Sequence, residues 1–412
     1  MVHEAGQHHD TLAPLRSIDL FCGAGGLACG LTSRGFDVRL GSDIWKPAAD
    51  TYRANFPGHR FDQVDIRDLT ASDILEASGG TPPDLVAGGP PCQGFSSAGA
   101  RAMNDERNTL VGWYSRLAAE VRPPVVVFEN VEGFLTASNG KYVVDLFDPL
   151  IEAGYVLRLE KLNVANFGVP QLRKRVIVIA ALDRTPQRLV PTNSASGAPG
   201  VWRVGAGLPP TVSAAEALSK VSASKRDPLS LTRTPGDLEL ARIQGLEQGK
   251  TMRDLPPHLQ HKSWLTRANR RVRDGMPTER RGGAPIGLRR LRADEPSKAI
   301  TGAATREFVH PTEDRTLTLR EAAALQTFPD TFEFVGSRAD IATMIGNAIP
   351  PKFAAELASA VHATLAMPPD FSEPGVVDFR STNAEAMSPA LARVTQLVEQ
   401  RYGVANSVPA LF

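Results

Sequence analysis

One cysteine in this chain of 412 residues lies in a segment suited to covalent chemistry. Cys92 stands within GGPPCQGFS (88–96), directly after a short apolar run at 85–87. Prolines stiffen such a loop, and glycines let another molecule approach the backbone closely. A lone cysteine is usually a small buried apolar residue, but nearby cations or a helix N-terminus lower the pKa of a thiol and activate it. Cys92 is therefore a candidate nucleophile.

An acidic residue and two arginines lie beside other apolar runs. Glu129 follows VVVF (125–128), where partial burial would make it a usable proton donor; the alternative is a helix N-cap. Arg173 and Arg175 lie just before VIVIAA (176–181). Alternate side chains of a strand point to the same side, so both guanidinium groups could hold phosphate or a carbonyl oxygen.

A glycine-rich turn follows the first apolar run. The segment DLFCGAGG (19–26) leads from a strand pattern into a helical one, and Asp43 comes at the end of the second apolar run. Glycines there allow a ligand to approach the backbone, and an acidic side chain at the second position can accept hydrogen bonds from ribose hydroxyls. The pattern favours a nucleoside cofactor; a tight turn without ligand and a nicotinamide dinucleotide site are the alternatives.

These candidates all follow elements of one alternating pattern. Strands are expected at 16–21, 38–41, 62–66, 85–87, 125–128 and 176–181, and helices at 46–55 and 143–153. Buried β-branched runs separated by helices indicate a doubly wound, mostly parallel α/β sheet. Such sheets bind ligands beyond the carboxyl ends of their strands, where Cys92, Glu129 and the glycine turn lie.

The pattern stops near residue 182. Residues 184–305 are rich in Pro, Gly, Ser and Arg, which indicates a smaller, loop-rich domain. Helices are expected again at 317–325 and 352–365, and a last one from Ser388-Pro389 to just before Gly403. The expected division is a flexible N-terminus (1–15), a catalytic domain (16–183), the loop-rich domain (184–309), a second part of the catalytic domain (310–366), and a linker with a tail helix (367–412).

The composition is that of a soluble globular protein. Lys and Arg number 46 against 45 Asp and Glu, 42% of residues are hydrophobic and 22% are charged. Three cysteines do not form a disulfide framework, no apolar run could span a membrane, and no secretory signal is apparent. We therefore expect a cytoplasmic protein that does not bind membranes.

One segment departs from this balanced charge. Residues 261–292 contain ten basic and two acidic residues, among them Arg270, Arg271, Arg289 and Arg290. Such a segment is typical of a polyanion site, although a solvated surface loop is the simpler interpretation of a charge run alone.

Five blocks of the sequence resemble, in order, the cytosine-C5 DNA methyltransferases that use S-adenosylmethionine. They are DLFCGAGGL (19–27), GGPPCQGFS (88–96), ENV (129–131), GVPQLRKR (168–175) and IGNAIPP (345–351), with RTLTLREAAALQTFPD (315–330) similar to the block before the last. The resemblance implies that Cys92 attacks C6 of a cytosine, that Glu129 contacts N3 and the 4-amino group, and that Arg173 and Arg175 contact the cytosine and the DNA backbone.

The resemblance also implies the binding positions. Those for the cofactor are Asp19, Phe21, Gly23, Gly25, Gly26, Asp43, Ile44, Asp65, Ile66, Pro90, Leu110 and Asn347. The family has an aromatic residue directly after the ribose-binding acid; here Ile44 holds that place and Trp45 follows. The expected DNA contacts are Gln93, Ser96, Arg270, Arg271, Arg289 and Arg290, and no metal is expected.

The chemistry of cytosine explains these residue types. A thiolate bonded to C6 makes C5 nucleophilic enough to take a methyl group, and a stacked duplex blocks C6, so the base must be flipped out. Residues 96–108 would then close over the base, and the loop-rich domain would recognise the target sequence.

Four hypotheses follow. The first is a DNA cytosine-C5 methyltransferase, monomeric, acting on double-stranded DNA, either solitary or paired with a restriction endonuclease. The second is a tRNA methyltransferase, disfavoured because that branch has PPCQPFT where this chain has PPCQGFS. An inactive binding module would have no reason to keep Cys92, Glu129 and Arg173 together, and a nicotinamide-dependent dehydrogenase would explain neither Cys92 nor the basic segment.

Overall fold

A single eight-stranded sheet forms the centre of the molecule. The computed structural model describes residues 13–91, 109–194, 207–221, 227–260, 287–381 and 387–403. The strand order is β12-β6-β8-β5-β4-β1-β2-β3, and all neighbouring pairs are parallel except those that β8 makes with β5 and β6. The strands are β1 (Arg16–Leu20), β2 (Asp37–Ser42), β3 (Arg60–Asp62), β4 (Leu85–Gly88), β5 (Val125–Asn130), β6 (Tyr155–Asn163), β8 (Lys174–Leu182) and β12 (Gly375–Arg380).

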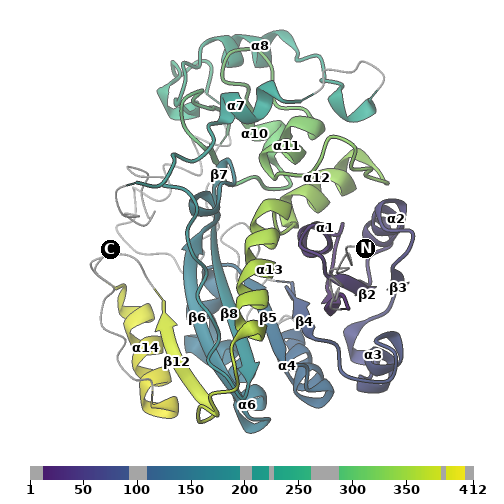
Figure 1. Ribbon diagram of the computed structural model, residues 1–412. Coiled ribbons are helices and arrows are strands. Elements are labelled where there is room, and N and C mark those ends of the chain that lie inside the picture. The colour runs from purple at the N-terminus through teal and green to yellow at the C-terminus, as the bar shows by residue number, and fades with distance from the viewer. Residues whose placement is uncertain are drawn as a thin grey trace, which may run out of the picture.

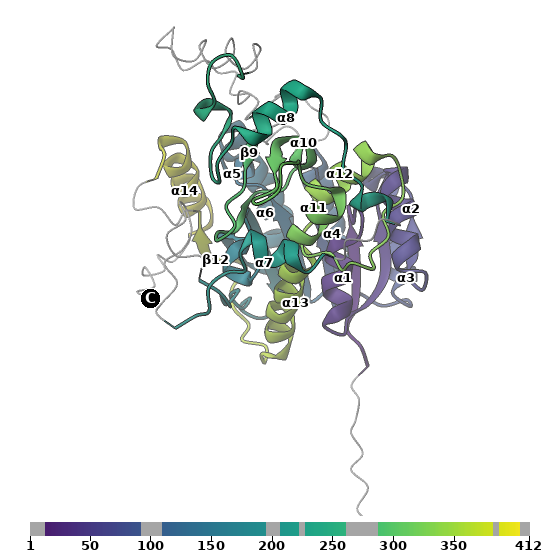
Figure 2. The same cartoon turned by 90° about the horizontal axis from the view of Figure 1, so that it is seen from above.

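Helices cover both faces of this sheet because its strands are apolar on both sides. In β5, Val126 and Phe128 pack on the face covered by α3, α4, α6 and α14, while Val125 and Val127 pack under α1 and α13. Figures 1 and 2 show α1 and α13 on the side opposite to α4 and α6. The helices are α1 (Gly26–Ser33), α2 (Lys46–Asn55), α3 (Ala71–Ala77), α4 (Leu110–Val121), α5 (Gly133–Thr136), α6 (Lys141–Glu152), α13 (Pro351–Ala366) and α14 (Pro389–Tyr402). The expected doubly wound, mostly parallel α/β fold is therefore confirmed.

Three strands of the central sheet, β3, β6 and β12, differ from the sequence-based expectation. The strand expected at 62–66 lies at β3, and residues Ile66–Asp68 form a 3-10 turn instead, because the Asp65 side chain accepts a hydrogen bond from the Arg67 N–H (2.9 Å) and caps the turn. β6 was not expected, since its sequence YVLRLEKLN places charges among apolar residues. Two of those charges form ion pairs with distant residues, Arg158 with Asp378 and Lys161 with Glu132, and the Glu160 carboxylate accepts a hydrogen bond from the Leu189 N–H (3.3 Å).

A smaller lobe lies above the sheet in Figure 1. Its helices and short strands are α7 (Ala214–Ser219), α8 (Asp237–Gln244), β9 (Arg289–Arg290), β10 (Ser297–Lys298), α10 (Ala304–Glu307) and β11 (Phe308–Val309). It packs on α11 (Leu319–Leu325) and α12 (Arg338–Asn347) through one apolar cluster, and β10 pairs with β7 (Gln171–Leu172). The chain then returns to the sheet through α13.

The C-terminal segment joins the central sheet. β12 adds an edge strand beside β6, and Leu391, Val394 and Val398 of α14 pack into the core beside α5 and α6. α14 begins and ends where the sequence predicts, with Ser388 as N-cap and Gly403 as left-handed C-cap. β12 and α14 thus pack with the sheet domain; the tail helix lies where it was expected, whereas a strand at 375–380 was not expected. No helix within the described ranges is long and apolar enough to cross a membrane.

Candidate active site

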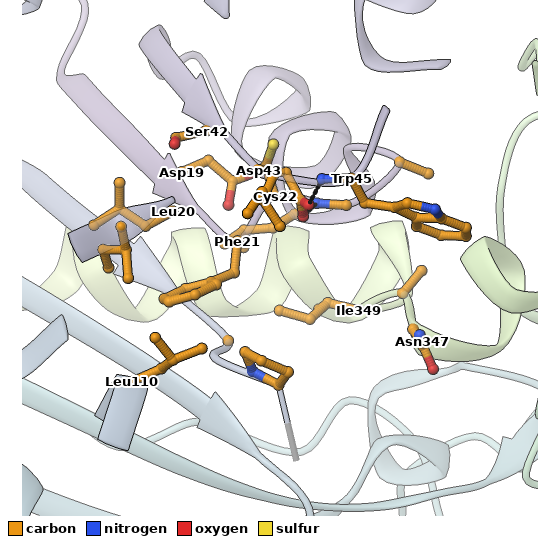
Figure 3. Close-up of a pocket in the computed structure, with 18 of the residues that line it drawn as sticks. Asp19, Leu20, Phe21, Cys22, Ser42, Asp43, Trp45, Leu110, Asn347 and Ile349 are labelled. Atoms are coloured by element: carbon orange, nitrogen blue, oxygen red, sulfur yellow. Dashed lines mark hydrogen bonds between the residues drawn. The ribbon is translucent and has the colours of Figure 1, made fainter. Parts of the chain in front are cut away.

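A cavity of about 640 Å³ opens beyond the carboxyl ends of β1 to β5. Segments that follow five parallel strands meet there with the C-terminal end of α12. Figure 3 shows Phe21 and Leu110 on one side of it, Trp45 and Asn347 on the other, and Asp43 between them. Nine of the twelve expected cofactor positions line it: Asp19, Phe21, Gly23, Asp43, Ile44, Asp65, Ile66, Leu110 and Asn347.

The turn after β1 is held in a left-handed conformation that exposes its backbone. Phe21 has φ 56° and Gly23 has φ 54°, and no atom lies within 4 Å of the place where a Cβ on Gly23 would stand. A side chain at position 23 would be strained and would project into open space that borders the cavity. This glycine therefore leaves room for a ligand.

Asp43 is fixed by the same turn. Its Oδ2 accepts a hydrogen bond from the Gly23 N–H (3.0 Å) and its Oδ1 from the Trp45 N–H (2.9 Å). Each carboxylate oxygen keeps a second lone pair for an incoming hydroxyl. Burial nevertheless raises the pKa of Asp43, against the lowering effect of these hydrogen bonds.

Asp19 places a second carboxyl group at the cavity. The residue is 1% exposed, and its Oδ2 atom has no hydrogen-bond partner. Burial raises the pKa of Asp19 well above its usual range, and the negative charge of Asp43 adds to the effect. A buried oxygen without a partner is costly, so this one suits a cationic or hydrogen-bond-donating ligand group.

Three expected cofactor positions do not line the cavity. A Cβ on Gly25 would lie 2.5 Å from the Phe56 ring, and one on Gly26 would lie 2.2 Å from the Ile349 carbonyl oxygen. These two glycines therefore serve close packing rather than ligand contact. Pro90 is buried, its carbonyl accepts from Asn130 Nδ2 (3.2 Å), and its neighbours Gly89 and Pro91 line the cavity instead.

The other side of the nucleoside-type site differs from the family pattern. Ile44 is 62% exposed, whereas Trp45 is partly buried against the apolar cluster that includes α11 and α12, and both residues line the cavity.

Asp65 forms an ion pair with Arg67 (2.7 Å), and this pairing lowers the pKa of Asp65. Asp65 therefore remains ionised and oriented at the cavity rim.

Glu129 and Arg175 form an ion pair at the end of β5. Arg175 Nε lies 2.5 Å from Glu129 Oε1, although the Nε–H is not aligned for a hydrogen bond. A Cβ on Gly89 would lie 3.0 Å from Glu129 Oε2, so a larger residue at that position would press on the carboxylate. Glu129 lines the same cavity as Asp19 and Asp43.

Arg173 does not share this position, contrary to expectation. It is 3% exposed, and its guanidinium donates to the carbonyl oxygens of Ile300 (2.7 Å), Gly346 (2.8 Å) and Ala348 (3.4 Å). Because these contacts bury the group within the protein, it is not placed to contact a cytosine.

The expected DNA contacts are only partly described. Cys92, Gln93, Ser96, Arg270 and Arg271 lie outside the described residues, as do the loop at 96–108 and most of the basic segment.

Arg290 corrects one of these expectations. Its guanidinium is buried and donates to the carbonyls of Ile243, Leu246, His310 and Glu313 and to the Asp314 carboxylate. It therefore joins α8 to the 310–314 loop instead of facing DNA. Arg289 is half-buried and its Nε atom has no hydrogen-bond partner, so it stays a candidate.

Sequence reasoning missed most of the C-terminal wall of the cavity. Thr343, Met344, Ala348 and Ile349 line it beside Asn347, the only member that was expected. The helical pattern of 338–347 could have shown that Thr343 and Met344 lie one turn before Asn347.

Known proteins are similar to this chain in sequence and in fold. The C-5 cytosine-specific DNA methylase family matches residues 15–363. Type II methyltransferase M1.HphI of Haemophilus parahaemolyticus is 33% identical over 357 residues, covering 84% of this chain and 86% of its own. Type II methyltransferase M.NgoFVII of Neisseria gonorrhoeae is 32% identical, covering 84% and 85%.

The fold comparison agrees. The crystal structure of a prophage-encoded DNA modification methyltransferase of E. coli has a TM-score of 0.65 at 22% identity, covering 86% of this chain and all of its own. This likeness shows the shared fold. The family match over most of the chain shows that the protein belongs to the C-5 cytosine-specific DNA methylases and is a DNA cytosine-5 methyltransferase.

Proposed function

We propose that this enzyme methylates C5 of a flipped-out cytosine within a specific double-stranded DNA sequence, using S-adenosylmethionine and a covalent bond from Cys92 to C6. The observation that carries the proposal is that one cavity is lined both by residues expected to bind the cofactor and by Glu129, which is expected to contact the cytosine. Asp19, Gly23 and Asp43 lie in it together with Glu129, and Pro91, the residue before Cys92, also lines it.

The residues present fit the methyl donor. Asp43, fixed through both oxygens, would accept hydrogen bonds from the ribose hydroxyls. The partnerless Oδ2 of Asp19 suits the positively charged methionine portion, and the open space beside Gly23 lets that portion approach the backbone. When bound, S-adenosylmethionine supplies an electrophilic methyl group.

The protein's own residues prepare the cytosine. The Cys92 thiolate forms a bond to C6 while Glu129 holds a proton at N3, so that C5 becomes an enamine carbon able to take a methyl group. Once C5 carries the methyl group, the C5 proton leaves to a base, and the electron pair of that C–H bond forms the C5=C6 double bond and expels the Cys92 thiolate. Arg175 keeps the Glu129 carboxylate oriented throughout.

Substrate recognition is assigned to the lobe between β8 and α11. Its basic segment would contact DNA phosphates, and Arg289 would be one of these contacts. The relatives are named as Type II methyltransferases, so we propose that this enzyme, acting as a monomer in the cytoplasm, also belongs to a restriction-modification system with a partner endonuclease.

Base-resolution sequencing of methylated cytosines in DNA from a host that expresses the protein tests the proposal. We expect methylation at one short motif, absent in a Cys92→Ala strain that makes the same amount of protein. Methylation that persists in the variant would overturn the covalent mechanism. Methylated tRNA without methylated DNA would overturn the choice of substrate.

A further inference from the structure

Arg173 and Arg175 lie two residues apart but serve different parts of the molecule. Arg175 approaches Glu129, whereas the Arg173 guanidinium lies among backbone carbonyls of two distant segments. We propose that Arg173 is a positioning residue that holds the C-terminal wall of the cofactor cavity, and thereby sets the affinity for the cofactor. This inference rests on the proposed use of S-adenosylmethionine.

The position of Arg173 is set by the end of β6. Its N–H donates to Asn163 Oδ1 (3.0 Å), and its carbonyl accepts from the Val164 N–H (2.9 Å). Arg173 lies between β7 and β8 and belongs to neither strand. Its backbone is therefore anchored before the side chain reaches across to α12.

The guanidinium caps the C-terminal end of α12. The last carbonyls of a helix lack partners within it and carry partial negative charge, so a cation there is favourable. Arg173 Nη2 donates to the carbonyls of Gly346 and Ala348, which flank Asn347, and Gln326 Nε2 donates to Ile345 (2.5 Å). Three carbonyls around the end of α12 are thus held by side chains.

This end of α12 is part of the cavity. Asn347, Ala348 and Ile349 line it directly, so a shift of the carbonyls that Arg173 holds would move the lining. The opposite side is just as confined, because the Ile349 carbonyl packs against Gly26 with no room for a Cβ. The wall is therefore fixed between Arg173 on one side and the start of α1 on the other.

A polar bridge reinforces the arrangement. Gln171 Nε2 donates to Gln326 Oε1 (2.6 Å) and to the Leu325 carbonyl (2.9 Å), and its Oε1 accepts from the Ile300 N–H (3.0 Å). These buried bonds join β7 to α11 and to the segment at residue 300. Arg173 thus belongs to a network of buried hydrogen bonds, and removal of its guanidinium would displace the residues that line the cavity.

The test compares Arg173→Met with Arg184→Met. Arg184 Nη1 donates to the carbonyls of Leu365 (2.9 Å) and Met367 (3.0 Å), so it caps the end of α13 in the same way but away from the cavity. S-adenosylhomocysteine binding is measured by isothermal titration calorimetry without DNA, and urea unfolding is measured for both variants. Methylation rates are measured at saturating cofactor.

We expect Arg173→Met to raise the Kd for S-adenosylhomocysteine at least tenfold, to raise the KM for S-adenosylmethionine in parallel, and to leave kcat within about threefold. Arg173→Lys should recover part of the affinity, since an ammonium can still donate to one or two carbonyls. Arg184→Met should leave the Kd unchanged at a similar loss of stability. If Arg173→Met does not fold, Gln326→Met removes the neighbouring support at Ile345 and should raise the Kd in the same direction.

An unchanged Kd in Arg173→Met, with kcat or DNA affinity lost, would overturn the inference and return Arg173 to a substrate contact. An equal rise in Arg184→Met would do so too, because the effect would then be general. A wild-type protein that binds S-adenosylhomocysteine but methylates no DNA would refute the proposed function while leaving the binding comparison intact.

Discussion

Gly26→Ala is expected to weaken cofactor binding by displacing the cavity wall. An added Cβ would lie 2.2 Å from the Ile349 carbonyl oxygen, whereas ordinary contact begins at 3.4 Å, so the backbone at 349 must move by about 1.2 Å. Ile349 lines the cavity, and displacements of about 1 Å in a binding site can change rates by about a hundredfold. We therefore expect at least a tenfold rise in the Kd for S-adenosylhomocysteine.

The effect on stability should be smaller than the effect on binding. Overpacking costs about 1–3 kcal/mol, and alanine is favoured over glycine inside a helix by about 1 kcal/mol. Gly26 is the first residue of α1, where this helix preference is only partly realised, so a net loss of about 1–2 kcal/mol is expected in urea unfolding. The folded variant can therefore be studied directly.

Gly30→Ala provides the matched control. Gly30 lies one turn further along α1, and a Cβ there would lie 2.3 Å from Ala354 Cβ and 2.6 Å from the Ala355 nitrogen of α13. The clash is comparable, but Ala354 and Ala355 do not line the cavity. The reasoning is refuted if Gly26→Ala binds S-adenosylhomocysteine as the wild type does, or if Gly30→Ala loses as much affinity.

Three further outcomes are expected. Burial raises the pKa of Asp19, so the folded wild type loses stability relative to Asp19→Asn as the pH rises from about 4 through the raised pKa. Urea unfolding at pH 8 should therefore find Asp19→Asn more stable than the wild type. The variant should nevertheless bind the cofactor more weakly. Asp378→Asn removes the buried carboxylate that Arg158 and Arg188 approach at 2.6 Å, and should lower the free energy of unfolding by about 3–5 kcal/mol. Asp294→Asn, at the exposed pair with Arg292, should lower it much less, and equal losses would contradict this. Arg290→Met should lower the affinity for DNA, measured by fluorescence anisotropy, and leave the Kd for S-adenosylhomocysteine unchanged. A variant with normal affinity for both would show that the hydrogen bonds from Arg290 to α8 and to the 310–314 loop do not orient the lobe.

The sequence predicted those elements whose signals are local. The caps of α14, the buried run of β5 and the glycine turn after β1 each depend on a few consecutive residues, and each appears where expected. β6 and β12 were not expected, because the buried Arg158 of β6 is compensated by Asp378 of β12, 220 residues away in the chain. A charge within a strand pattern does not reveal its distant partner.

For the same reason, the sequence could not distinguish the roles of neighbouring glycines or of the two arginines. Gly23 and Gly26 look alike in sequence, but Gly23 has open space beside it and lines the cavity, whereas Gly26 packs against the Ile349 carbonyl. Arg173 and Arg175 would lie on one side of a continuous strand. The strand is interrupted between β7 and β8 at Arg173, so strand alternation does not apply there and the first arginine turns to α12.

The position of Arg173 also connects the lobe to the cavity. The Arg173 guanidinium donates to the carbonyl of Ile300, in the lobe, and to the carbonyl of Gly346, next to Asn347 in the cavity wall. A shift of either segment would therefore strain a buried, charge-assisted hydrogen bond. The close contact of Gly346 with Thr301 and Gly302 leaves no room for independent movement either. The wall at residues 343–349 follows the lobe in the chain, and the lobe packs on α11 and α12, so Arg173 and this apolar cluster both join the lobe to the wall. The discontinuous order of the sequence motifs thus has a physical consequence, because the lobe that we assign to DNA recognition and the cavity that we assign to the methyl donor share one structural support.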